Sequence, residues 1–107
     1  MWATVPDIAD ALGTDVLKVR QHVRDGALIA IRGDDGVLRI PADFAGDGRI
    51  LKGLPGLIVV LRDNGYGDEE IVRWLYEDDD SLPGYPVLAL LENRGTEVKR
   101  RAQALGW

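Results

Sequence analysis

The chain contains no cysteine, a single histidine and no long apolar segment. Without cysteine it has no disulfide, no thiolate nucleophile and no cysteine-rich zinc site, which suits a reducing compartment. The lone His22 makes neither a metal site nor a catalytic triad, and we expect it on the flank or core side of a helix. Apolar runs such as Leu57 to Leu61 are far too short to span a bilayer. The start MWATVPD has no signal-peptide pattern, so we expect a cytoplasmic protein without a membrane partner.

Motifs of catalysis are also missing. The sequence has no glycine-rich phosphate loop, no nucleophile elbow and no pair of carboxylates placed for acid–base work. The acidic run Glu77 to Asp80 lacks the alternating ligands and the glycine of a calcium loop, so a solvated loop is expected there. We therefore predict no catalytic residue, no metal, no cofactor and no enzymatic activity.

Length and charge suggest two unequal halves. With 107 residues and 46% hydrophobic content, the chain can bury one ordinary core or two very small ones. The Gly46-Asp47-Gly48 turn is the predicted boundary between domains at residues 1–48 and 49–107. The net charge of -5 opposes binding to nucleic acid, but it divides into -1 over residues 1–53 and -4 over residues 54–107. Each protomer is therefore expected to bind DNA weakly or to need a partner.

Two short helices joined by a glycine are predicted near the start. Thr4 caps the first helix, Thr4 to Leu12, with a proline in its first turn and an acid three residues after the cap. Gly13 stops that helix, and Thr14 is the expected cap of the next. Two helices with a turn of this length are typical of a helix-turn-helix.

The second helix, Asp15 to Gly26, has an apolar stripe and a basic face. Val16, Val19 and Val23 recur at helical spacing and form the predicted core side. The residues expected to contact DNA from the opposite side and one flank are Lys18, Arg20, Gln21 and Arg24. Gln21 suits adenine and an arginine suits guanine, whereas the other cations suit phosphates. Leu17 touches either a thymine methyl group or the first helix.

A hairpin is predicted directly after this helix. Ala27 to Arg32 and Val37 to Ile40 are rich in Ile, Val and Leu, and the loop between them, Gly33 to Gly36, holds two glycines and two aspartates. Such a hairpin is the wing of a winged helix-turn-helix. Arg32 and Arg39 are its candidate contacts to backbone phosphates.

The remaining sequence predicts a compact bundle of about four short helices, so the fold class is mainly α with a small β-hairpin wing. The helix over Leu54 to Gly65 has a proline start and a sufficient length, although its apolar run also fits a buried strand. Asp68 to Glu77 has acids in its first turn and an apolar face of Ile71, Trp74 and Leu75. The other two predicted helices are Pro86 to Asn93 and Glu97 to Leu105, the latter capped by Thr96 with Val98, Ala102 and Leu105 inward.

The strings IADALG, RDG and ALIAIRGDDGVLRIP resemble the winged helix-turn-helix of MerR-like and excisionase-like DNA-binding proteins over about the first forty-five residues. Nearly the whole chain also resembles a family of small actinobacterial DNA-binding proteins. That similarity rests on LPGL at Leu54 to Leu57, Asn64-Gly65-Tyr66, EIVRWL at Glu70 to Leu75, Pro86-Val87 and RRAQA at Arg100 to Ala104. The family has an N-terminal winged helix-turn-helix and a helical C-terminal domain, and it includes a substrate of a membrane serine/threonine kinase. The resemblance implies DNA binding by the N-terminal half and a kinase as a partner.

We predict a protein that binds double-stranded DNA as a transcriptional or nucleoid-associated regulator, with residues 15–25 in the major groove and the hairpin 27–40 as wing. Two alternatives stay open. In the first, the helical half binds a protein or a second copy, as in antitoxin-like or adaptor proteins, which the acidic balance and the terminal Trp2 and Trp107 favour. In the second, the protein bends DNA as excisionase-like factors do.

Overall fold

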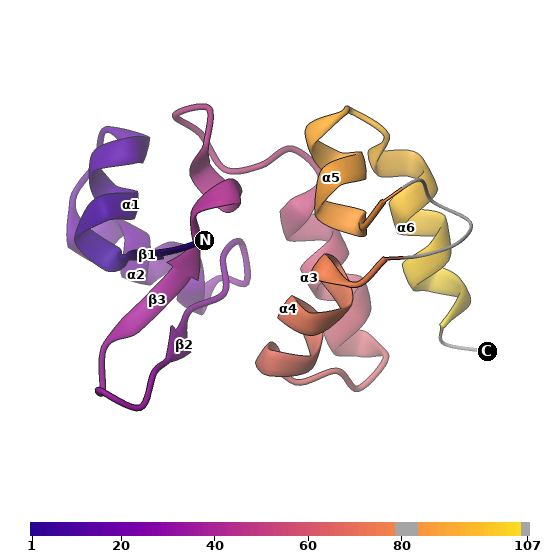
Figure 1. Cartoon of the computed structure of the whole chain (residues 1–107), viewed down its shortest axis with the longest axis horizontal. Coiled ribbons are helices and arrows are strands. Elements are labelled where there is room, and N and C mark those ends of the chain that lie inside the picture. The colour runs from indigo at the N-terminus through magenta and orange to yellow at the C-terminus, as the bar shows by residue number, and fades with distance from the viewer. Residues whose placement is uncertain (79–83, 106–107) are drawn as a thin grey trace. The chain divides into compact units, whose positions relative to one another are not determined.

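The computed structural model of the chain describes residues 1–78 and 84–105. The elements follow in the order β1 (Trp2–Thr4), α1 (Val5–Leu12), α2 (Val16–Arg24), β2 (Ile31–Arg32), β3 (Leu38–Pro41), the 3₁₀ helix η1 (Ala42–Ala45), α3 (Leu54–Asp63), α4 (Asp68–Tyr76), α5 (Pro86–Leu91) and α6 (Gly95–Ala104) (Figure 1). The chain divides into two compact units, Met1–Leu51 and Lys52–Trp107. The sequence places the domain boundary slightly earlier, after Gly48.

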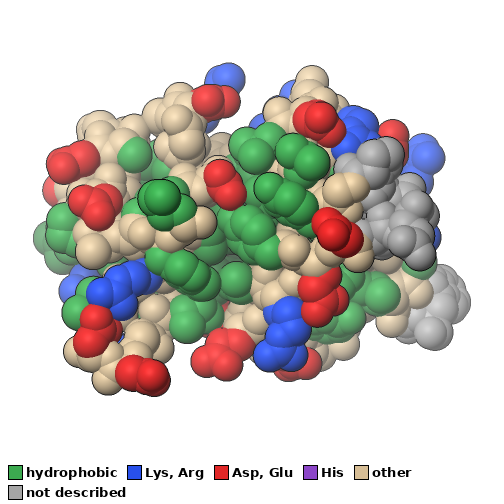
Figure 2. Space-filling view, viewed as in Figure 1, with side chains coloured by type: hydrophobic (Ala, Val, Ile, Leu, Met, Phe, Trp, Pro, Cys, Tyr) green, Lys and Arg blue, Asp and Glu red, His purple; other side chains and the backbone are tan. Residues whose placement is uncertain are grey.

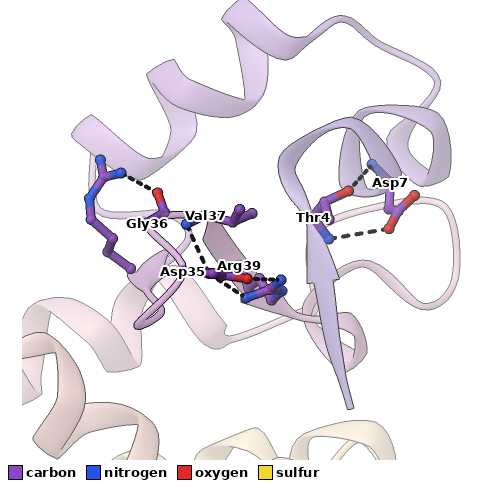
Figure 3. A network of polar contacts seen from close by, with 7 residues as sticks. Thr4, Asp7, Asp35, Gly36, Val37 and Arg39 are labelled. Atoms are coloured by element: carbon purple, nitrogen blue, oxygen red, sulfur yellow. Dashed lines mark hydrogen bonds and ion pairs between the residues drawn. The ribbon is translucent and has the colours of Figure 1, made fainter.

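The start of α1 is fixed by a reciprocal cap. The Thr4 hydroxyl accepts a hydrogen bond from the backbone N–H of Asp7 at 3.3 Å, and the Asp7 carboxylate accepts one from the N–H of Thr4 at 3.2 Å (Figure 3). Both N–H groups would otherwise lack a partner within the helix. The helix ends at Gly13, whose φ of 67° is left-handed. The predicted helix and its glycine stop are both present.

The start of α2 differs from the prediction by one residue. Asp15, not Thr14, is the N-cap, because its backbone is extended and its carboxylate accepts a hydrogen bond from the N–H of Lys18 at 2.8 Å. Thr14 lies in the turn, where its own N–H donates to the carbonyl of Ala9. Both threonine and aspartate can cap a helix, so the backbone conformation after Gly13 decides which of the two residues is the N-cap of α2.

The predicted hairpin is part of a three-stranded antiparallel sheet with the order β1-β3-β2. Strand β1 was not predicted from the sequence. It pairs with β3 so that Trp2 lies opposite Pro41, and the N–H of Ala42 donates to the carbonyl of Met1 at 2.9 Å. Strand β1 therefore covers one edge of β3 and joins the chain start to the hairpin.

The first strand of the hairpin is shorter than predicted. Only Ile31–Arg32 is a strand, whereas Leu28 and Ile29 precede it in an irregular segment and are both fully buried. Consecutive residues of a strand point to opposite faces, so burial of both suits a loop that passes through the core. They share this core with Ile8, Val19, Ile40 and Phe44.

The second unit consists of the predicted helices α3 to α6. Proline stands in the first turn of α3 and of α5, and acids fill the first turn of α4. A side-chain bond links two helices, because the Asn64 amide at the end of α3 donates to the carbonyl of Ala102 in α6 at 2.9 Å. Helix α3 contains the whole apolar run after Pro55, so the helix alternative for this run is confirmed and the strand alternative is wrong. Within the residues described, no helix is long and apolar enough to cross a bilayer.

Three details of this unit were predicted wrongly. Helix α6 begins at Gly95 with Arg94 as N-cap, so Thr96 lies inside the first turn and caps nothing. Leu105 follows the helix end and is 43% exposed, although it was expected to point inward. Trp74 is only half-buried, while Ile71 and Leu75 on its helix are fully buried.

Candidate nucleic-acid interface

Helix α2 presents a polar surface to solvent. Val19 is fully buried beneath the helix, and Val16 and Val23 beside it are half-buried, so the predicted apolar stripe faces the core. The predicted DNA contacts of this helix are all exposed: Lys18, Arg20, Gln21 and Arg24. The helix can therefore place cations and one amide against a ligand without breaking its packing.

Two other side chains of α2 complete its surface. Leu17 is 76% exposed, which argues against the alternative that it packs on α1 and leaves it free for a thymine methyl group. His22 is half-buried on the flank of the helix. Across residues 1–78 and 84–105, no group of three or more His, Asp or Glu side chains is placed to hold a metal ion. Asp79 and Asp80 of the acidic run lie outside the described residues.

The turn of the hairpin is held by its own backbone. The N–H of Gly36 donates to the carbonyl of Gly33 at 2.9 Å, and the N–H of Gly33 donates to the carbonyl of Val37 at 3.0 Å. Gly36 has a φ of 81°, a conformation that costs glycine little and most other residues more. The Asp35 carboxylate also accepts from the N–H of Val37 at 3.0 Å. These bonds fix where the side chains of the turn lie.

Arg39 and Asp35 form an ion pair along this hairpin (Figure 3). The Arg39 guanidinium donates to both carboxylate oxygens of Asp35, at 2.7 and 3.2 Å. The hydrogen bonds from Arg39 and then from the Val37 N–H lower the pKa of Asp35 from 3.8 to about 2. The same pair raises the pKa of Arg39. The predicted phosphate contact Arg39 is thus engaged by a carboxylate that the sequence did not reveal as its partner.

The two arginines of the hairpin lie on opposite faces of the sheet. Arg39 is paired with Ile31, and Leu38 is paired with Arg32. Directly paired residues share a face, and neighbours along a strand alternate. Arg39 lines a small cavity of about 160 Å³ together with Trp2, Ile31 and Gly33. Arg32 faces the other way.

Arg32 shares its side of the hairpin with a residue of α2. Arg20 and Arg32 both line a cavity of about 270 Å³, whose other walls come from the start of α1 and from residues 36–38. The structure therefore brings Arg20 and Arg32 to one cavity. Lys18, Gln21 and Arg24 lie on the same helix as Arg20. Arg39 lies apart from them, on the other face of the sheet. The sequence indicated each residue but not this grouping.

Charges of both signs are mixed on the surface of the hairpin end of the first unit. In the space-filling view, Lys and Arg side chains lie next to Asp and Glu side chains there (Figure 2). This agrees with the Arg39–Asp35 pair and with exposed Asp34 at the turn. The cationic surface is therefore local, and it is concentrated on α2 and Arg32 rather than spread over the wing.

Known proteins match both units. A family model described as the winged helix-turn-helix domain of DNA-binding protein Rv2175c matches residues 1–45, and one described as the Rv2175c C-terminal domain of unknown function matches residues 51–106. The DNA-binding protein Rv2175c of Mycobacterium tuberculosis is 40% identical over 115 residues, which cover 96% of this chain and 79% of the relative. The NMR structure of Rv2175c is similar with a TM-score of 0.89 and 39% identity, over 100% of this chain and 82% of that one.

These matches confirm the predicted fold class, a winged helix-turn-helix followed by a helical domain. They also agree with the actinobacterial family inferred from LPGL, EIVRWL and RRAQA. The sequence match at 40% identity covers 96% of this chain, and the structural match covers all of it, so both units are included in the similarity. The chain belongs to the Rv2175c family, in which a winged helix-turn-helix domain precedes a C-terminal domain of unknown function.

Proposed function

We propose that this protein binds double-stranded DNA, with α2 in the major groove and the β2–β3 hairpin along the backbone. The observation that carries the proposal is the exposed face of α2, where Lys18, Gln21 and Arg24 have no role in the core. The described Mycobacterium tuberculosis relative is named a DNA-binding protein, which supports the same function here. A helix of this length fits the groove and reads few base pairs.

The net negative charge of the chain makes the cations of α2 important for its affinity for DNA. The chain as a whole carries a net charge of -5, so its overall field repels DNA. Binding must therefore come from close contacts, in which each neutralised phosphate releases condensed counterions. Removing Lys18 and Arg24 should cost a large part of the affinity.

The first test is fluorescence anisotropy of a labelled mixed-sequence duplex, titrated with the wild type and with a Lys18→Ala/Arg24→Ala variant at several salt concentrations. Wild-type binding should weaken steeply as salt rises, with a log–log slope of roughly -0.9 per phosphate, and the variant should show a shallower slope. The matched control is Lys99→Ala/Arg100→Ala, which removes the same charge from exposed positions of α6 in the second unit. Equal binding by wild type and the Lys18→Ala/Arg24→Ala variant would refute the proposed role of α2.

We propose a regulatory role in transcription or nucleoid organisation, exerted by two copies on neighbouring sites. One short helix supplies too few base contacts for useful specificity, so a second copy or a companion protein is needed. The second unit is the proposed contact between copies, and Val59 and Leu91 are exposed on it, at 52% and 46%. Sizing the protein with and without DNA tests this, and one protomer on a short isolated site would contradict it.

The location of the protein, its lack of a catalytic step and its kinase partner are proposed from the sequence. We place the protein in the cytoplasm and assign it no catalytic step, on the grounds of its missing cysteines and catalytic motifs. A serine/threonine kinase is the partner implied by the family resemblance. Thr4 is an unfavourable target for that kinase, because its hydroxyl caps α1. Incubation with a kinase and mass spectrometry of the product would identify any modified residue.

A further inference from the structure

The cavity between α2 and the hairpin is lined by cations and by no acid. Arg20 and Arg32 reach it from two different elements, and the other lining residues are Thr4, Gly36 and apolar side chains. Of the acids near it in the sequence, Asp7 belongs to the cap of α1 and Asp35 is paired with Arg39. Asp34 is exposed at the turn of the hairpin and is not among the lining residues. Both charged side chains that line this cavity are therefore positive, although the whole chain is acidic.

Arg32 is held in place within the cavity wall. Its guanidinium donates to the carbonyl of Gly36, across the turn of the hairpin. A guanidinium has five N–H donors, so most of them stay available for a ligand. Within the parts of the chain that the structure describes, neither Arg20 nor Arg32 forms an ion pair with a carboxylate.

We propose that Arg20 and Arg32 bind a single phosphate of the DNA backbone between them, and so couple the recognition helix to the wing. This inference rests on the DNA binding proposed above and names the ligand of one part of that surface. Two guanidinium groups at one cavity repel each other, and a shared anion removes that repulsion. Phosphate oxygens suit the planar fork of arginine, which can donate two parallel hydrogen bonds.

The position of the cavity fits a backbone phosphate better than a base edge. It lies between a helix that would enter the groove and a hairpin that would follow the groove wall. Phosphate contacts of this kind fix the register of a protein on DNA without reading its sequence. Arg32 is then the wing arginine that holds this phosphate, whereas Arg39 lies on the other face of the sheet and is paired with Asp35.

A double-mutant cycle tests the shared phosphate. The affinity of a labelled duplex is measured at several salt concentrations for wild type, Arg20→Ala, Arg32→Ala and the double variant. Each single change should weaken binding by roughly tenfold to a hundredfold, as expected for a charge-assisted hydrogen bond. The double variant should lose much less than the product of the two factors, and its salt slope should fall by about 0.9, the value for one phosphate. The matched control is Arg49→Ala, an exposed arginine of the same unit outside α2 and the hairpin, which should have little effect.

Other outcomes overturn the proposal in distinguishable ways. Multiplicative losses with a slope change of about 1.8 mean that the arginines hold separate phosphates. Losses no larger than that of Arg49→Ala mean that the cavity binds no phosphate, while DNA binding itself stands if Lys18→Ala/Arg24→Ala still weakens it. A wild type that fails to bind at low salt overturns both proposals.

A second variant keeps the test valid if the alanine proteins unfold, which circular dichroism would show. Arg20→Lys/Arg32→Lys preserves both charges and removes the bidentate fork. Its affinity should fall severalfold with an unchanged salt slope. Wild-type affinity in this variant would contradict the proposed geometry.

Discussion

The Arg39 guanidinium lies against the Asp35 carboxylate, with two hydrogen bonds of 2.7 and 3.2 Å between them. The pair turns the second arginine of the hairpin toward the turn and neutralises its charge. The carboxylate is fixed in turn by the Val37 N–H. Asp35 therefore acts as an internal competitor for any phosphate that approaches Arg39.

Asp35→Asn should strengthen DNA binding, because it frees Arg39 and removes a negative charge. The expected gain is about twofold to fivefold, the range typical of one exposed ion pair, measured by anisotropy at moderate salt. Asp34→Asn is the matched control, since Asp34 is exposed at the same turn. If Asp34→Asn gives an equal gain, only the local charge matters and the release of Arg39 does not. A loss of affinity in Asp35→Asn would refute the competition.

The same ion pair predicts how pH affects stability. The pKa of Asp35 is lowered in the folded protein to about 2, so the contribution of the pair is present above the unfolded value of 3.8 and is lost as pH falls toward 2. The difference in free energy of unfolding between wild type and Asp35→Asn should be constant from about pH 5 to 8 and should shrink below about pH 4. Urea titrations across this range measure it. A difference that changes near neutral pH would point to another group.

Asp15→Ala should destabilise the first unit by about 1 kcal/mol, the usual cost of losing an N-cap. Its carboxylate holds the N–H of Lys18, whereas the Thr14 side chain caps nothing in α2. Thr14→Ala is the matched control, with an expected change of at most a few tenths of a kcal/mol. Urea unfolding followed by circular dichroism compares the two. Equal losses of unfolding free energy in the two variants would mean that Thr14 contributes to the cap as much as Asp15 does.

Local chemistry explains which elements the sequence could predict. The cap of α1 depends on Thr4, Pro6 and Asp7, and its end depends on Gly13, all within a few residues of each other. The proline starts of α3 and α5 and the acids at the start of α4 are equally local. Helix formation is governed by such short-range signals, so these bounds agree with the structure to within a few residues.

Elements that depend on distant partners were not predictable. Strand β1 is short and becomes a strand only because it pairs with β3, where Ala3 lies opposite Ile40. The pairing of Arg39 with Asp35 needs the geometry of the turn. Arg20 and Arg32 line one cavity only because α2, the start of α1 and the hairpin come together in the folded first unit. A sequence pattern identifies such residues as exposed cations, but only the fold decides which of them share a site.

Gln21→Ala should change which DNA sequence is preferred and leave the salt dependence unaltered. Gln21 is exposed on α2 and uncharged, so it neutralises no phosphate, and its amide matches the donor and acceptor of adenine in the major groove. Selection from a random duplex pool by wild type should yield an adenine at one position, and the variant should lose that preference by roughly fivefold to a hundredfold. Lys18→Ala is the contrasting variant. It should weaken binding to all sequences alike and lower the salt slope by about 0.9. If Gln21→Ala selects the same sites as wild type, the amide reads no base, and sequence preference must come from the arginines or from Leu17.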